Sequence, residues 1–580
     1  ECWQTVNRLD RERVRDDHKK AAVISAPTGF GKTEAFLGPI YKLLLDGRQE
    51  GAAIVYPSRA LLQDQLGRIL PHLHRINASH DESLSVGLYM GGQPWKMEEV
   101  ETSKFFDRTQ SRPRFKLTNC WCGSAEEPHA LEFHGSSQTY EIRCEEDEGH
   151  CFSDSELILP RSEVIFSNQP DILLTTLESL ESFAHKPHYP LIDGFDTIVL
   201  DEIHLNTQLR GAHAAKIIAN VNDISDEPLL WLGSSATIDN PARFGRQIFG
   251  IEDETNIEAL RPPESDFDRN HADTEHYYFL LAPEDGPGVS SMSIQQHMLL
   301  GHCLLENDIG DRGKLLAFID SISQVNQKNV QLMNADSDRQ LWQYHADQED
   351  DIEDWRALAS AMGHQFIEEP LEIMRVFADE GFDSEIAARS DLLLSTSFLE
   401  VGIDVGEITI VTQYRTPWDL SSFLQRAGRA ARQPGTDSHI VVFLSNLTND
   451  ANMFYRAEQF LDSSIRTPLN VDNPVVEWIH DRFNQYYRRS ADINANQGQY
   501  RSNNEEHKAF IQGYLAEDLG YGEAADLLLR PRTFFDDYFE GDIEVSQEPL
   551  LSTAMVVEIR EVLETYHDEI RDDFRDIEDY

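Results

Sequence analysis

Two glycines, a lysine and a threonine stand close together near the start of the chain, in the run Ala26-Pro-Thr-Gly-Phe-Gly-Lys-Thr33. Glycines let a backbone bend so that several N–H groups converge on one anion. A lysine directly after such a loop can reach phosphate oxygens, and a threonine hydroxyl can hold Mg²⁺. A surface turn is the alternative for such a loop on its own. We expect the loop to bind a nucleoside triphosphate through Thr28, Gly29, Gly31, Lys32 and Thr33.

Two adjacent carboxylates, Asp201 and Glu202, directly follow the apolar run Thr197-Ile-Val-Leu200. Open α/β folds bind ligands at the carboxyl ends of their strands, so this position is suited to chemistry. Asp201 is expected to hold Mg²⁺ through water, and Glu202 to orient and deprotonate an attacking water. Small hydroxyl residues that follow the next apolar run are expected to bond to the acidic strand and to His204, and to couple the site to nearby loops. These are Ser235 and Thr237.

Three arginines surround a glycine in Gln425-Arg-Ala-Gly-Arg-Ala-Ala-Arg432. Guanidinium groups match the geometry of phosphate oxygens, so such a concentration in an acidic chain predicts an anionic partner. The alternative is a solvated helix face.

Short apolar runs separated by helical patterns are the elements that must position these residues. The chain has 580 residues, more than a single core usually supports, so several domains are expected. The runs fall in two groups, which predict two α/β lobes. The expected strands are 21–25, 52–57, 197–200 and 229–233 in the first group, and 314–319, 391–396 and 408–412 in the second.

The charge balance is strongly acidic, with 50 Lys and Arg against 102 Asp and Glu and a formal net charge of -52. A dispersed acidic surface keeps a protein hydrated in high salt, which predicts a salt-adapted source; an ordinary acidic protein is the alternative. The same field repels nucleic acid, so a nucleic-acid partner must be held by local groups. No run of about 20 apolar residues predicts a membrane span. The six cysteines do not suit a disulfide scaffold, which favours a cytoplasmic location.

A cysteine-rich stretch at about 95–165 lengthens the first lobe beyond what such a unit needs. Alternating residues at 131–134 and 140–143 predict a small hairpin between two cysteine pairs. A zinc ribbon would stabilise so short an insertion, with free thiols or a site that has lost its metal as alternatives. His129, His134 and His150 lie nearby. The expected zinc ligands are Cys120, Cys122, Cys144 and Cys151.

Six segments of the chain, taken in order, resemble the motifs of superfamily 2 helicases. They are 26–33, 57–61, 201–204, 235–237, 396–404 and 425–432. The Asp-Glu-x-His form is similar to the DExH branch. The stretches 54–65 and 201–213 look most like DNA helicases of the Lhr and Hrq/Mrf type, with CRISPR-associated helicase–nucleases and phage-defence helicases as close competitors.

The resemblance implies an α/β fold with two tandem RecA-like parallel-sheet lobes, a Cys-rich insertion and a mainly helical C-terminal region. The expected boundaries are 1–255 for the first lobe, 270–447 for the second and 448–580 for the helical region. It also places Gln425, Arg429 and Arg432 in the hydrolysis site, with the arginines acting from the second lobe. Gly402 and Asp404 would sense the nucleotide.

The activity that the resemblance implies is an ATP-dependent helicase or translocase that acts on DNA in repair or defence, with ATP and Mg²⁺ as cofactors. RNA stays open as the nucleic acid, and subunits of a repair or defence complex are expected partners. The alternative is a nucleic-acid-stimulated ATPase that remodels or recruits a complex without separating strands. Glycines and short polar side chains would hold the strand by its phosphates. The expected strand contacts are Pro57, Arg59, Gly91, Gly92, Thr175, Thr176 and Thr396.

Overall fold

The structure is a computed structural model that describes the chain between residues 2 and 480. The segments outside the described residues are 1, 27–30, 81–82, 110–111, 124–128, 137, 168, 178, 181–191, 237, 263–274, 304–312, 347–353, 377–386, 388, 397–398, 400–407, 418–419, 431–436, 464–468, 472, 474–475, 478–479 and 481–580.

The first lobe is built on an eight-stranded parallel sheet in the order β13-β1-β12-β11-β2-β10-β3-β9. Its central strands are buried throughout because helices cover both faces, as parallel sheets require. The sheet includes a strand beyond the expected boundary at 255, so that boundary was too early. The strands are β1 (Lys20–Ser25), β2 (Ala52–Tyr56), β3 (Val86–Tyr89), β9 (Leu157–Ile158), β10 (Ile172–Thr176), β11 (Thr197–Leu200), β12 (Leu230–Ser235) and β13 (Ile257–Leu260).

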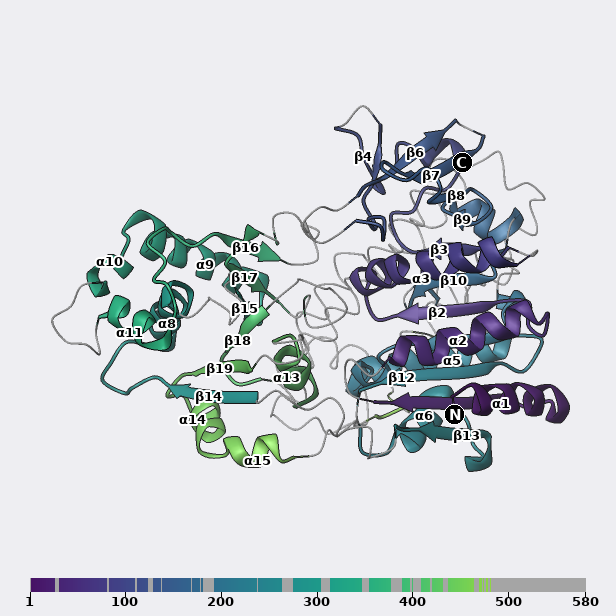
Figure 1. The fold of residues 1–580 in the computed structure, drawn as a ribbon. Helices are drawn as coiled ribbons and strands as arrows, with labels where there is room; N and C mark the ends of the chain where they lie inside the picture. The colour runs from purple at the N-terminus through teal and green to yellow at the C-terminus, as the bar shows by residue number, and fades with distance from the viewer. Residues whose placement is uncertain are drawn as a thin grey trace, which may run out of the picture.

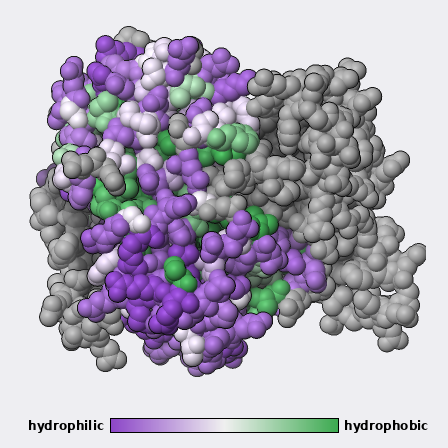
Figure 2. Space-filling model, turned by 90° about the vertical axis from the view of Figure 1, so that its right-hand side faces the viewer, coloured by the Kyte–Doolittle hydropathy of each residue, from purple (hydrophilic) through white to green (hydrophobic). Residues whose placement is uncertain are grey.

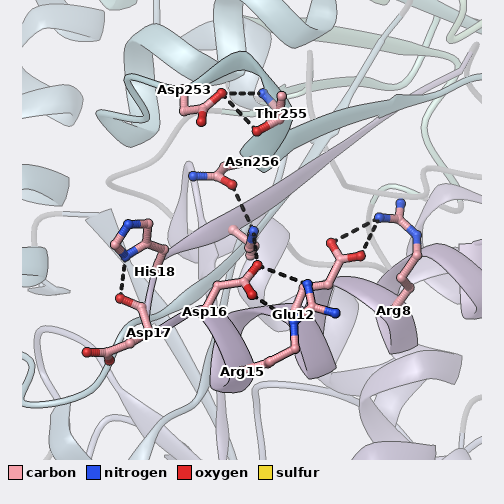
Figure 3. A network of polar contacts seen from close by, with 10 residues as sticks. Arg8, Glu12, Arg15, Asp16, Asp17, His18, Asp253, Thr255 and Asn256 are labelled. Carbon is pink, nitrogen blue, oxygen red and sulfur yellow. Dashed lines mark hydrogen bonds and ion pairs between the residues drawn. The ribbon is translucent and has the colours of Figure 1, made fainter.

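Two apolar clusters form the core of this lobe, one on each face of the sheet. Helices α1 (Cys2–Asp16), α2 (Lys32–Leu45) and α3 (Arg59–Ser79) contribute to one cluster. Helices α5 (Gln208–Ile224) and α6 (Pro241–Phe249) contribute to the other. The side-chain amine of Lys20 ties the end of α1 to the β13 edge, because it donates to Asp16 at 3.1 Å and to Asn256 at 2.8 Å (Figure 3).

The second lobe repeats the design with six parallel strands in the order β14-β19-β18-β15-β17-β16. Figure 1 shows it beside the first lobe, with its outer helices turned away from that lobe. The strands are β14 (Glu275–Leu281), β15 (Lys314–Phe318), β16 (Ile373–Val376), β17 (Leu392–Ser395), β18 (Ile408–Tyr414) and β19 (Ser438–Leu444). The helices are α8 (Val289–Cys303), α9 (Ile322–Met333), α10 (Trp342–His345), α11 (Trp355–Met362) and α13 (Leu420–Ala427). The two tandem parallel-sheet lobes confirm the predicted fold class.

The insertion forms a separate five-stranded antiparallel sheet above the first lobe (Figure 1). Its two ends are held together, since the backbone N–H of Arg161 donates to the carbonyl of Pro94 at 2.8 Å and that of Ser162 to Trp95 at 3.0 Å, and its apolar residues pack in one cluster with those of α3. The predicted hairpin is present as its two longest strands. The strands are β4 (Phe106–Asp107), β5 (Arg114–Phe115), β6 (Leu131–Gly135), β7 (Tyr140–Cys144) and β8 (Cys151–Ser153).

Two short helices follow the second lobe, α14 (Thr448–Tyr455) and α15 (Ala457–Leu461). Most of the predicted helical region lies outside the described residues. The face drawn in Figure 2 is mainly hydrophilic with small, scattered apolar patches, as the acidic composition predicts. Among the described helices, none combines the length and the apolar character needed to cross a membrane.

Candidate ATP site, strand-binding surface and metal centre

The predicted phosphate loop connects β1 to α2, the strand–loop–helix arrangement that such a loop needs. Gly31 lies just before the helix with a φ of 70°, a left-handed conformation that favours glycine. The first turn of α2 holds Lys32 and Thr33, whose backbone N–H groups point toward the loop as those of any helix N-terminus do. Thr28 and Gly29 lie outside the described residues, so their part in the site stays a prediction.

The acidic residues Asp201 and Glu202 lie at the same edge of the sheet as Lys32. The side-chain nitrogen of Lys32 lies 3.6 Å from a carboxylate oxygen of Glu202. Asp201 is buried, and burial together with the charge of Glu202 raises its pKa to about 6. Two carboxylates facing one lysine leave an excess of negative charge, which a divalent cation would neutralise. The residues therefore fit Mg²⁺, with Asp201 and Thr33 as the candidates to hold it.

Glu202 has an unusual backbone, with a φ of 48° in a non-glycine residue. Strained conformations of this kind concentrate at functional sites. One of its carboxylate oxygens is buried and accepts no hydrogen bond from the described residues. It is the oxygen that lies 3.6 Å from Lys32 and 3.4 Å from His204, so Glu202 must turn away from Lys32 before it can take a proton from water.

His204 connects this pair to both lobes. Its Nδ1 accepts a hydrogen bond from the backbone N–H of Ala236 at 3.2 Å and lies 3.4 Å from Glu202. Its Nε2 contacts the side-chain amide of Gln425, which belongs to α13 of the second lobe. The atom of Gln425 that faces Nε2 is its amide nitrogen.

The predicted coupling through hydroxyl groups needs a correction. His204 is reached by the backbone of Ala236 and not by Ser235, whose hydroxyl is buried and has no hydrogen-bond partner among the described residues. Thr237 lies outside the described residues. The β12 loop does contact His204, but the backbone makes the contact because the side chain of Ser235 points into the lobe.

The arginine segment lies on and just after α13. Arg426 is buried and makes these contacts within the second lobe: it donates to Gln413 at 2.6 Å and lies 3.6 Å from Asp320. Arg429 is also buried, one turn further on. Arg432, Gly402 and Asp404 lie outside the described residues. The arginine-finger roles of Arg429 and Arg432 and the sensing roles of Gly402 and Asp404 therefore stay predictions.

Two predicted strand contacts, Arg59 and Gly91, lie against each other. Arg59 is exposed at the start of α3, and its guanidinium lies so close to Gly91 that a Cβ there would be 2.1 Å from Nη2. Gly92 has a φ of 76°. A Cβ at position 91 would push this guanidinium aside, so the loop and the side chain form one surface. Pro57 directly precedes Ser58, which caps α3 by accepting from the N–H of Leu61 at 3.2 Å.

Thr175 and Thr176 do not belong to that surface, which corrects a prediction. The hydroxyl of Thr175 donates to the carbonyl of Tyr89 at 2.8 Å, and that of Thr176 to Ser179 at 3.1 Å. Both residues are buried. They hold the ends of β3 and β10 together instead of meeting a strand. Thr396 is half-buried at the end of β17, in the second lobe.

Known proteins match both lobes of the chain. A DEAD/DEAH box helicase model matches residues 11–102, and a helicase conserved C-terminal domain model matches residues 361–433. The uncharacterized ATP-dependent helicase MJ1574 of Methanocaldococcus jannaschii is 21% identical over 478 residues, which are 80% of this chain and 54% of that protein. Both lobes thus contain segments that match superfamily 2 helicase domains, in agreement with the resemblance carried by the motifs.

Two further proteins show how far this similarity extends. The Lhr helicase/probable uracil glycosylase of Mycolicibacterium smegmatis is 24% identical over 325 residues, 54% of this chain and 20% of that protein. The crystal structure of the DUF1998 helicase MrfA bound to DNA shares the fold, with a TM-score of 0.50 and 17% identity over 83% of this chain and 51% of the other. The chain thus spans about half the length, or less, of these relatives.

A cluster of potential metal ligands lies in the insertion of the first lobe. Ligand atoms of Cys120, Cys122, Cys144 and His150 all lie within 4.8 Å of one another. The sulfur of Cys122 is 3.3 Å from that of Cys120 and 3.5 Å from that of Cys144. Tetrahedral zinc with bonds of about 2.3 Å to sulfur separates its thiolates by about 3.8 Å, so the four side chains fit zinc.

The fourth residue of this cluster corrects the predicted set, which had Cys151 in place of His150. Cys151 is the first residue of β8 and pairs with Arg143 of β7. Neighbouring residues of a strand point to opposite faces, so Cys151 faces away from Cys144 while His150, just before the strand, reaches Cys120 at 3.4 Å.

Sequence reasoning missed Arg210. Its guanidinium donates to the carbonyl of Pro57 at 3.1 Å, from the first turn of α5. The residue stands eight positions after Glu202, directly behind the acidic motif, but no sequence pattern links it to Pro57.

Proposed function

We propose that this chain is the motor of an ATP-dependent helicase or translocase that acts on DNA. One observation carries the proposal: Lys32, Glu202 and His204 of the first lobe form a continuous set of polar contacts that ends on Gln425 of the second lobe. A site of this kind binds a nucleotide between two lobes and can therefore turn hydrolysis into relative movement.

The proposed steps use the residues in these positions. Lys32 neutralises phosphate charge, while Glu202 turns from Lys32 toward a water molecule and takes its proton. Bound Mg²⁺ would add charge neutralisation at the phosphates, held by Asp201 and Thr33. His204 passes the state of Glu202 to Gln425, so the second lobe responds when the phosphate leaves.

DNA is proposed because MrfA, which shares this fold, was solved with DNA. The exposed Arg59 beside the Gly91–Gly92 loop supports strand binding, since it gives an acidic protein a local cation next to free backbone groups. DNA repair or defence is the setting that we propose for the activity, and subunits of such a complex are the proposed partners. A zinc ion is the proposed occupant of the Cys120, Cys122, Cys144 and His150 cluster, where it would staple the small sheet of the insertion.

A strand-displacement assay tests the proposal, with ATP, Mg²⁺ and a tailed DNA duplex in high potassium chloride. We expect displacement by the unmodified chain, and we expect Glu202→Gln to bind ATP but not turn it over. Strand-stimulated hydrolysis without displacement would instead support the remodelling ATPase. Normal hydrolysis by Glu202→Gln would overturn the assignment of the site. Replacing the DNA with RNA of the same sequence tests the choice of nucleic acid.

A further inference from the structure

Arg210 lies between two loops to which the proposed function gives different roles, one in ATP hydrolysis and the other in strand binding. One loop runs from Asp201 to Asn206 and carries the hydrolysis residues. The other begins at Pro57 and carries Arg59. The two loops follow neighbouring strands, since β11 pairs with β2 and the N–H of Asp201 donates to the carbonyl of Val55 at 2.9 Å.

The hydrogen bond from Arg210 to Pro57 joins these loops through side chain and backbone. Its donor is a guanidinium, and its acceptor is the carbonyl of the residue directly before the cap of α3. That carbonyl precedes the helix, so the ladder of α3 does not use it. A charged donor on such a carbonyl fixes the orientation of the peptide between Pro57 and Ser58, and thereby the start of the helix that carries Arg59.

The hydrolysis loop is built to transmit a change to Arg210. Glu202 holds a strained backbone conformation, so the loop has a more relaxed alternative when its contacts change. A short 3₁₀ turn, Ile203–Leu205, connects Glu202 to the first turn of α5 with no flexible linker between them. Gly211 keeps that first turn pressed on the loop, because a Cβ there would lie 2.3 Å from the carbonyl of Asn206.

We propose that Arg210 is a positioning residue that couples ATP hydrolysis to strand binding, by linking the Asp201–Asn206 loop to the Pro57 turn. The inference rests on the proposed function. Arg210 would form a connection within the first lobe, whereas His204 and Gln425 form a connection between the two lobes. A strand held at Arg59 would then bias Glu202 toward its working position, and loss of the phosphate would loosen the strand.

The test compares Arg210→Gln, Arg210→Lys and a control, Arg243→Gln. Lysine keeps the charge and a donor, whereas glutamine is too short to reach Pro57. Arg243 is exposed on α6 of the same lobe, so its replacement removes the same charge away from both loops. The readout is the ratio of the ATPase rate at saturating single-stranded oligodeoxythymidylate to the rate without it.

We expect Arg210→Gln to lower this ratio about tenfold, within the range of measured coupling energies, with partial rescue by lysine and no change in the control. Equal loss of both rates would show a merely structural role and overturn the proposal. An unchanged ratio with a higher half-saturating strand concentration would make Arg210 a phosphate contact and also overturn it.

A second measurement keeps the inference separate from the proposed function. Amide hydrogen exchange at residues 58–62 is followed with and without a non-hydrolysable ATP analogue. We expect the analogue to slow exchange there in the unmodified chain but not in Arg210→Gln. If the unmodified chain hydrolyses no ATP, the proposed function fails, and this measurement still decides the role of Arg210. The same response in both chains, or none in the unmodified chain, would overturn the inference.

Discussion

Ionised Asp201 is expected to lower the stability of the folded protein, and its replacement with asparagine should show by how much. Burial and the neighbouring Glu202 raise the pKa of Asp201 from the ordinary 3.8 to about 6. Since each pH unit corresponds to about 1.4 kcal/mol, the ionised side chain costs the fold about 3 kcal/mol. Asparagine carries no charge and keeps an oxygen for the N–H of Glu202, which donates to Asp201 at 3.0 Å.

The raised pKa of Asp201 determines whether stability rises or falls with pH. The folded state holds the Asp201 proton more tightly than the unfolded state, so wild-type stability falls as pH rises from about 4 to about 6 and then stays low. Asp201→Asn should therefore match wild type near pH 4 and be about 3 kcal/mol more stable at pH 7.5 and above. It should also lose ATP hydrolysis, because Asp201 is the proposed metal carboxylate.

Urea unfolding measures the difference at both pH values, followed by tryptophan fluorescence. Trp231 is a suitable reporter because it is fully buried in β12, the neighbour of the strand that ends at Asp201. Asp226→Asn is the control, since it removes the same charge from an exposed site of the same lobe. The reasoning is refuted if Asp201→Asn is no more stable at pH 7.5, or if the gain is equally large at low pH.

Three further predictions follow from the described contacts. Cys144→Ser should lose bound zinc as measured by elemental analysis of the purified protein, whereas Cys151→Ser should retain it; equal zinc content in both would contradict the ligand set with His150. Gly91→Ala should displace Arg59 and weaken single-stranded DNA binding by fluorescence anisotropy about tenfold, while Gly38→Ala, where a Cβ meets nothing within 4 Å, should not. Gln425→Ala removes the contact with His204 and should slow strand-stimulated ATP turnover about fivefold, since a hydrogen bond contributes about 1 kcal/mol; an unchanged rate would exclude that contact from the working site.

The meeting of Lys32 with Asp201 and Glu202 was predictable from the sequence because parallel strands bring their carboxyl ends to one edge. The apolar runs before Lys32 and Asp201 identify two such strands, and topology then places their loops together. This is a consequence of strand order, which a pattern of apolar runs encodes well. The strand contacts at Arg59 and Gly91 were proposed from residue type alone and stay predictions.

The errors concern which way a single side chain points. Cys151 and His150 are neighbours, and the start of β8 decides which of them faces Cys144. Thr175 follows the apolar run of β10 and looks like a loop residue, yet its hydroxyl is held by Tyr89 inside the sheet. The contact between Arg210 and Pro57 joins residues far apart in the chain. Such details depend on the packing of elements that a single sequence does not specify.

The way the insertion is attached has a consequence for how the chain can change. The side-chain amide of Gln93 donates to the carbonyls of Leu88 and Leu159, each at 2.6 Å, and so ties the two ends of the insertion to each other. Between these points the chain adds β9 to the sheet of the first lobe and builds the sheet of the insertion, whose apolar residues share one cluster with those of α3. The rings of Trp121 and Phe152 lie 5.3 Å and 6.2 Å from that of His74 on α3. Removal of the insertion would therefore expose apolar side chains of α3 to water, so the insertion and the helix that carries Arg59 are expected to fold and to vary together.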